Sequence, residues 1–301
     1  MPRPLLDPAL VERLRLLELR VRRRVDGALT GRHRSPTRGA SVEFAEHQEY
    51  SPGAELRHVD WRVLGRLDRI MLKRFEERTE LRTVLAVDAS RSMGYRGARA
   101  RAAKIDLALS LAAALAHVLA HQGDPVGLHV FPSDTDALLP PSARPAHLLE
   151  ILDRLSETEP GGRSTDLDAA LQRAARGVRR RGLVVVLSDL YDFTVDPRTL
   201  LSWLRRRHEV FVFAIVDPDE EDLPWDSPAI LEALEGTGRV KVDPDALREA
   251  YRAEVARFRG AWSSAASETG VRLHFLRTDL ALEDHLGVVF GASSAGHRRV
   301  A

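Results

Sequence analysis

The sequence contains no cysteine among its 301 residues and no long, uninterrupted apolar run. The absence of cysteine excludes disulfides, thiolate metal sites and cysteine nucleophiles. It also agrees with a location in a reducing compartment. The charge-free run 107–122 is interrupted by His117 and His121. A membrane span needs about 20 mostly apolar residues, so we expect no transmembrane segment. The arginine-rich N-terminus lacks the apolar core of a secretory signal, so we expect a cytoplasmic protein.

The chain also lacks a net excess of one charge, with 45 Lys and Arg against 44 Asp and Glu. Residues 1–40 are an exception, because they hold ten arginines against four acidic residues. Asp7-Pro8 predicts the start of an amphipathic helix that reaches about Leu29, followed by a linker. The basic face can bind nucleic acid or an acidic partner, or be the solvated side of a docked helix. We favour the docked helix, because no aromatic residue or motif supports nucleic-acid readout.

We expect residues 41–80 to form a segment that packs on the main sheet. Together with the N-terminal helix, this segment would make up an extension of helix and strand before the main domain. Ile70 to Phe75 alternates apolar and basic residues, as a half-buried strand does, and can pair with the strand that begins near Leu81. Trp61, beside Arg57 and Asp60, is typical of a buried brace rather than a catalytic site.

From residue 81 onwards, apolar strands alternate with helices. Expected strands cover 83–87, 125–131, 182–187, 210–216 and 271–276. Near-uniform apolar strands separated by helices are typical of a parallel sheet covered on both faces. We therefore predict an α/β domain over residues 81–290 with a doubly wound, mostly parallel, Rossmann-type sheet. A C-terminal insertion at about 218–270 is expected to form a hairpin and a helix, and residues 291–301 a disordered tail.

Three loops of this sheet carry hard oxygen ligands. Asp88, Ser90 and Ser92 follow the first strand, Thr165 precedes a helix, and Asp189 follows the strand 182–187. In an open parallel sheet the loops after the carboxyl ends of central strands share one edge, so we expect these groups to converge. Two carboxylates and three hydroxyls suit a small hard cation such as Mg²⁺ or Mn²⁺. Thr165, Asp166 or Asp189 can alone be helix caps, but their shared placement favours a metal site.

The same residues resemble a known site. DASRS at 88–92, Thr165 and Asp189 match the metal-ion-dependent adhesion site of von Willebrand factor A domains. The stretches EFAEHQEYSPGAELRHVDWR and KRFEERTELRTVLAVDASRSM are similar to the bacterial family called domain of unknown function 58. RRGLVVVLSDLYD, VDPDEEDLP and LRTD also resemble that family. The resemblance extends over residues 42–286.

This resemblance implies roles for the individual residues. Ser90, Ser92 and Thr165 would contact the metal directly, whereas Asp88 and Asp189 would hold it mainly through waters. An Asp or Glu of a protein partner would take the open position. Members of the family are associated with MoxR-type AAA+ ATPases, as adaptor or substrate-linking components. The resemblance thus implies a non-enzymatic, metal-dependent interaction module with such an ATPase as its partner.

Two other functions remain open from the sequence. One is a Mg²⁺-dependent phosphohydrolase with Asp88 as its nucleophile, but Ser90 stands where a second carboxylate is needed. No GxxxxGK[ST] loop, GxSxG elbow or HExxH helix occurs. The other is nucleic-acid binding through the arginine-rich N-terminus, which predicts a steep dependence of binding on salt.

Overall fold

The computed structural model describes the following residues: 5–17, 19, 42–49, 61–67, 70–77, 81–132, 138–161, 166–178, 181–225, 227, 229–232 and 238–290. The chain divides into two compact units. Met1–Arg22 and Leu81–Ala301 form the larger unit, and Arg23–Glu80 form the smaller one.

Within the described part of the larger unit, six strands form one sheet in the order β10-β7-β6-β3-β4-β5. They are β3 (Thr83–Asp88), β4 (Val126–Phe131), β5 (Leu138–Ser142), β6 (Leu183–Ser188), β7 (Glu209–Val216) and β10 (Arg272–Arg277). All neighbours run parallel except β5, which pairs antiparallel with β4 at one edge. The predicted mostly parallel α/β sheet is confirmed.

Every side chain of β3 and β6 is buried, which explains their uninterrupted apolar sequences. Successive side chains along a strand point to opposite faces of the sheet. Leu85 and Val87 accordingly join one hydrophobic core, and Val84 and Ala86 join the other.

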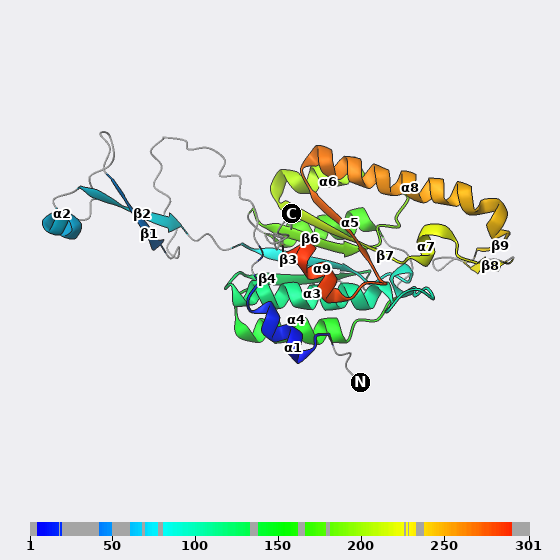
Figure 1. The fold of residues 1–301 in the computed structure, drawn as a ribbon, viewed down its shortest axis with the longest axis horizontal. Helices are drawn as coiled ribbons and strands as arrows, with labels where there is room; N and C mark the ends of the chain where they lie inside the picture. The colour runs from blue at the N-terminus through cyan, green and yellow to red at the C-terminus, as the bar shows by residue number, and fades with distance from the viewer. Residues whose placement is uncertain are drawn as a thin grey trace, which may run out of the picture. The chain divides into compact units, whose positions relative to one another are not determined.

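Helices cover both faces of the sheet (Figure 1). One face carries α1 (Pro8–Leu14), α3 (Lys104–His121), α4 (Pro145–Ser156) and α9 (Leu282–Val289). The other carries α5 (Leu167–Gly177), α6 (Pro197–Arg207) and α8 (Pro244–Thr269). Trp262 of α8 is among the largest fully buried side chains of the second core. Layers on both sides make the sheet doubly wound, as the alternation of elements indicates.

Among the described residues, α3 is the one helix long and apolar enough to cross a membrane by length and composition alone. Its 18 residues have a mean hydropathy of 1.3, and 72% of them are buried inside the protein. Core helices of globular domains reach the same values. Here α3 lies against the sheet and contacts α1, α4 and α9.

The N-terminal helix α1 is shorter than the sequence indicates, because it ends at Leu14 instead of about Leu29. Asp7 caps it by accepting a hydrogen bond from the Ala9 N–H at 2.8 Å, and Pro8 occupies its first turn. Leu10 and Leu14 are buried in the core with α3. The interpretation of a docked helix is therefore confirmed over Pro8–Leu14. The predicted linker lies outside the described residues.

The predicted C-terminal hairpin and helix are present. Strands β8 (Ala229–Glu232) and β9 (Arg239–Val242) pair antiparallel, and α8 follows directly after Asp243 caps its N-terminus. Because α8 joins β7 to its parallel neighbour β10, it is the crossover helix of this pair and covers the sheet. A four-residue helix α7 (Asp219–Asp222) precedes the hairpin. The predicted tail, residues 291–301, lies outside the described residues.

The smaller unit contains β1 (Val42–Glu49), α2 (Trp61–Leu67) and β2 (Met71–Glu77). Two expectations for this segment are wrong. Strand β2 pairs antiparallel with β1, whereas β3 pairs with β4 and β6, so the strand near residue 70 does not join the one near Leu81. Trp61 is 66% exposed and forms no buried brace, while Arg57 and Asp60 lie outside the described residues.

Candidate functional site

The candidate site lies where the strand order reverses. From β3 the chain continues to β4 and β5 on one side, and then returns to form β6, β7 and β10 on the other. Strands β3 and β6 are parallel neighbours, so their carboxyl ends share one edge. Ligands of open α/β sheets bind outside this edge at such a switch point. Asp88 ends β3, and Asp189 directly follows β6.

Asp88 is buried, and both of its carboxylate oxygens accept hydrogen bonds from neutral groups. Oδ1 accepts the Ser90 N–H at 2.9 Å, and Oδ2 accepts the Ser188 hydroxyl at 2.6 Å. Burial, aided by the charge of Asp189, raises the pKa of Asp88 from 3.8 to about 7. The ionised carboxylate is therefore poorly compensated, and a cation beside it would relieve this penalty.

The hydroxyls of Ser90 and Ser92 lie side by side, with their Oγ atoms 2.9 Å apart. Ser90 is 2% exposed, and Ser92 begins a short 3-10 helix, η2 (Ser92–Gly94). The spacing of two residues on a tight loop thus turns both oxygens toward one point. Their neutral oxygens are hard donors of the kind that Mg²⁺ accepts.

Asp189 is held from two sides. Its Oδ1 accepts the Tyr191 N–H at 3.1 Å, and its Oδ2 accepts a hydrogen bond from the Lys104 ammonium at 2.8 Å. Between them Leu190 adopts a left-handed backbone with φ of 64°, which turns the chain sharply after β6. This turn lets Leu190 N–H donate to the Ser188 hydroxyl at 2.9 Å.

The residues that flank the third predicted loop contact the same edge. Thr165 itself lies outside the described residues, but the chain on each side of it is attached to the site. Gly161 N–H donates to the Ala89 carbonyl at 2.7 Å, and Leu167 N–H donates to Asp192 at 3.1 Å. Asp166 caps α5 by accepting the Ala169 N–H at 2.8 Å, which confirms its capping alternative.

Together these groups line a small polar pocket with room for about one water molecule or ion. Its walls come from Asp88, Ser90, Ser92, Leu167, Ser188, Asp189, Leu190, Tyr191 and Asp192. The described residues contain no cluster of three or more His, Asp or Glu with metal-site geometry. A cation here would therefore depend on hydroxyl oxygens and waters as well as carboxylates. The pocket offers such an ion three carboxylates, of which Asp88 and Asp189 are buried, and two adjacent hydroxyls.

Sequence reasoning missed three residues at this edge: Lys104, Ser188 and Glu220. Lys104 is fully buried, and its ammonium also donates to both carboxylate oxygens of Glu220, at 2.7 and 2.8 Å. Burial lowers the pKa of Lys104, but the charges of Asp189 and Glu220 outweigh it and raise the pKa overall. A signal was available, because Lys104 is a lone lysine at the start of an otherwise apolar helix.

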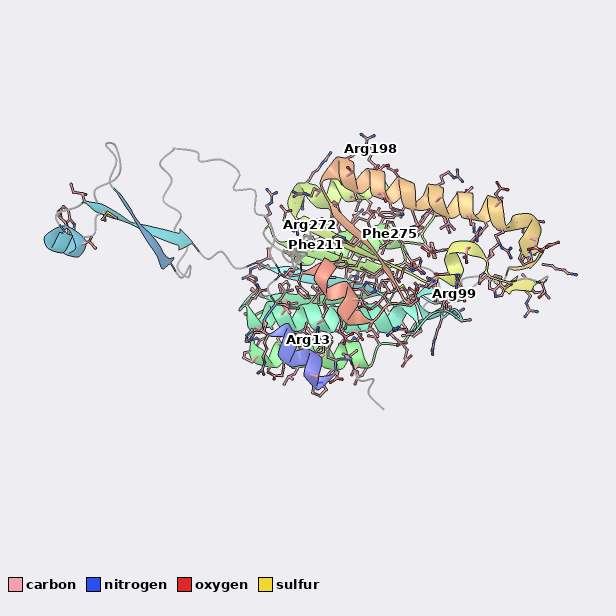
Figure 2. The ribbon with its side chains drawn as sticks, viewed as in Figure 1. Arg13, Arg99, Arg198, Phe211, Arg272 and Phe275 are labelled. Carbon is pink, nitrogen blue, oxygen red and sulfur yellow. The ribbon has the colours of Figure 1, made fainter. Side chains whose placement is uncertain are left out.

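The loop before α3 is anchored to the acidic segment after β7. Asp217 accepts the Gly97 N–H at 2.8 Å, and Asp219 accepts the Ala98 N–H at 2.6 Å. Arg99, beside α7 in Figure 2, pairs with Asp219 and Asp222. These contacts fix the chain that leads from the site into Lys104.

An apolar hollow adjoins the polar pocket and shares Asp189 and Tyr191 with it. Its walls are mainly aromatic and aliphatic, from Tyr191, Phe193, Val216, Tyr251, Val255, Phe258 and Phe275. The Phe193 ring lies 5.6 Å from that of Phe258, yet its side chain is 77% exposed. The site therefore combines a polar pocket with an aromatic surface on which Phe193 is exposed.

Residues 46–261 match the family described as protein of unknown function DUF58. Uncharacterised proteins of Mycobacterium tuberculosis and Mycobacterium bovis are each 31% identical over 284 residues, covering 91% of this chain and 86% of the relative. A conserved hypothetical protein, BatB, from Bacteroides thetaiotaomicron has a TM-score of 0.45 at 16% identity, over 71% of this chain and 97% of that one. An aerotolerance-related membrane protein from Bacteroides fragilis has a TM-score of 0.47 at 16% identity, over 70% and 99%.

Proposed function

This chain belongs to the DUF58 family, and we propose that it is a non-enzymatic, metal-dependent protein-interaction module with a von Willebrand factor A-like domain. The observation that supports this most is the convergence of Asp88, Ser90, Ser92 and Asp189 at the switch point of the sheet. These are the residues that resemble a metal-ion-dependent adhesion site. The expected fifth group, Thr165, belongs to the loop whose flanks reach the same edge.

The chemistry of the donors supports a recruiting role for the ion. Ser90 and Ser92, with Thr165, would contact Mg²⁺ or Mn²⁺ directly. Asp88 and Asp189 would act through waters, which fits carboxylates whose oxygens already accept hydrogen bonds. Hydroxyl ligands carry no charge, so the bound ion keeps much of its positive charge and attracts an Asp or Glu of a partner.

The surface beside the pocket supports binding to a protein. Exposed aromatic side chains next to a polar centre are typical of residues that contribute most to protein–protein affinity. Phe193 is exposed at this position, and the half-buried Tyr191 supports it with a ring centroid 6.1 Å away. The family resemblance suggests a MoxR-type AAA+ ATPase as the partner, with this chain as its cytoplasmic adaptor.

The geometry is less favourable to a phosphohydrolase. A nucleophilic Asp88 needs a free oxygen that faces the substrate, but both of its oxygens accept hydrogen bonds inside the protein. Its raised pKa also reduces the ionised fraction near neutral pH. Turnover of phosphate monoesters by the purified chain with Mg²⁺ would contradict the proposal of a non-enzymatic module.

Mg²⁺ or Mn²⁺ at millimolar concentration is expected to raise the melting temperature of the purified chain by several degrees. A ligand that binds only the folded state stabilises it by about 2.7 kcal/mol at a hundred times its Kd. Ser92→Ala and Thr165→Ala each remove one hydroxyl ligand and are expected to abolish most of the shift. Differential scanning fluorimetry, with EDTA as the reference, measures this effect.

Ser156→Ala is the matched control, because this hydroxyl at the end of α4 bonds only the Asp153 carbonyl. It is expected to keep the full shift. A wild-type chain that shows no shift with either ion would refute the metal site.

Capture of a purified MoxR-type ATPase by the immobilised chain is expected in Mg²⁺ and to fall at least about tenfold in EDTA. A buried charge-assisted contact of this kind contributes about 1.5–3 kcal/mol, so its loss weakens binding strongly. Ser92→Ala is expected to reproduce the effect of EDTA, and Ser156→Ala to have none. Equal capture with and without chelator would mean that the metal site is not the contact.

A further inference from the structure

Lys104 is a permanent positive charge built into the edge of the candidate site. Its side chain is 0% exposed, and its ammonium lies 4.9 Å from the centre of the Tyr191 ring and 5.9 Å from that of Tyr95. A buried ammonium is stable only when carboxylates and other hydrogen-bond acceptors compensate it. Asp189 and Glu220 supply this compensation at 2.8 and 2.7 Å.

The charges around the pocket do not balance. Three carboxylates line the pocket, those of Asp88, Asp189 and Asp192, and a fourth, Glu220, contacts Lys104. The Lys104 ammonium pairs with two of the four, Asp189 and Glu220. With all four carboxylates ionised, the group carries a net charge of −3, so it attracts a divalent cation. Lys104 compensates Asp189 and Glu220 but makes no bond to Asp88.

Lys104 and a divalent ion would share Asp189. One oxygen of this carboxylate accepts the ammonium and the other accepts the Tyr191 N–H, so a water bound to the ion must compete with both donors for the lone pairs of Asp189. The positive charge of Lys104 also repels a second cation at the pocket. Both effects weaken the hold of the protein on the ion.

We propose that Lys104 is a positioning residue that sets the affinity of the pocket for divalent cations by keeping Asp189 partly neutralised. This inference rests on the proposed cation site. The part of the Asp189 charge that Lys104 offsets is not available to the bound ion, so the ion binds an added carboxylate from a partner more strongly. In this arrangement the pocket binds the free ion less tightly, and tight binding of the ion requires the carboxylate of the partner.

The test is the dissociation constant of Mn²⁺, measured by electron paramagnetic resonance on the full-length chain. Lys104→Met, which keeps the length of the side chain but removes its charge, is expected to tighten Mn²⁺ binding by about tenfold or more. Its melting temperature without metal is expected to fall, because Asp189 and Glu220 lose their counterion. Lys241→Met removes an exposed lysine of β9 and is expected to leave both values unchanged.

A purely structural lysine gives the opposite sign, because loosening the site would weaken Mn²⁺ binding together with stability. Folded Lys104→Met with unchanged or weaker Mn²⁺ binding would therefore overturn the inference while leaving the cation site intact. If Lys104→Met fails to fold, Glu220→Gln decides. Asp189 then remains the sole carboxylate on Lys104, and Mn²⁺ binding is expected to weaken several-fold. An unchanged Mn²⁺ affinity in Glu220→Gln would overturn the inference, and a folded wild-type chain that binds no Mn²⁺ would overturn it with the proposed function.

Discussion

In metal-free buffer at pH 8, Asp88→Asn is expected to raise the free energy of unfolding by up to about 4 kcal/mol. The same variant is expected to lose the stabilisation that Mg²⁺ gives the wild-type chain. The reason is that burial and the charge of Asp189 raise the pKa of Asp88 from 3.8 to about 7. At pH 8 the folded protein must hold an ionised carboxylate where a neutral group is favoured. Asn keeps the shape and removes the charge.

The effect has a defined dependence on pH. Because the pKa of Asp88 is raised in the folded state, its contribution to stability is complete below about pH 4 and is lost as the pH rises through about 7. The stability difference between Asp88→Asn and the wild-type protein should therefore vanish near pH 4. Urea denaturation at pH 4, 6 and 8, with EDTA and with Mg²⁺, measures it.

Asp196→Asn is the matched control. Asp196 caps α6 from the surface by accepting the Thr199 N–H at 2.9 Å, and Asn is an equally good cap. This variant should change stability by less than about 1 kcal/mol and retain the response to Mg²⁺. An Asp88→Asn protein that is less stable than wild type at pH 8 without metal would show that the Asp88 charge is already compensated.

Gly97→Ala is expected to destabilise the fold by about 2–4 kcal/mol, because the loop before α3 has no space for a methyl group. A Cβ at this position would lie 2.5 Å from Oδ2 and 2.6 Å from Cγ of Asp219, and would also collide with Asp217. Both carboxylates accept backbone N–H groups of this loop, at Gly97 and Ala98. Moving them would leave buried polar groups without partners, and Asp217 is 0% exposed.

Gly260→Ala is the control for this substitution. Gly260 lies inside α8, where an added Cβ meets nothing within 4 Å. Alanine in place of an unhindered helical glycine is expected to stabilise the protein by about 0.5–1 kcal/mol. Chemical denaturation of the two variants should thus give changes of opposite sign. A neutral Gly97→Ala would mean that the loop moves away from Asp217 and Asp219 at little cost.

Local sequence patterns predicted the central strands of the sheet well, because these strands are buried on both faces. Val84 to Val87 and Val184 to Leu187 are apolar at every position, which few other local structures require. The alternation of these strands with helices indicated the parallel sheet. The shared edge of β3 and β6 followed from that architecture, so the convergence of Asp88, Ser90, Ser92 and Asp189 was predictable.

Pairing between distant segments was harder to predict. Strand β2 was expected beside the strand near Leu81, but its alternating pattern specifies a half-buried strand and not its neighbour. Trp61 was expected to be buried because Arg57 and Asp60 stand beside it in the sequence, but it is exposed on α2. The N-terminal helix ends at Leu14, even though apolar residues continue at helical spacing, and Leu16 is 86% exposed. Tertiary contacts, which local patterns do not contain, decide each case.

By itself the sequence determined the family, the mostly parallel sheet and the oxygen-bearing loops at its edge, because these depend on periodicity and on residue types close together in the chain. Only the tertiary structure decided what compensates the buried charges. Lys104 and Asp189 are 85 residues apart, and Lys104 and Glu220 are 116 apart. No local pattern relates such distant charges. Folding brings them within hydrogen-bond distance, and burial in a medium of low polarity makes their balance important for the site.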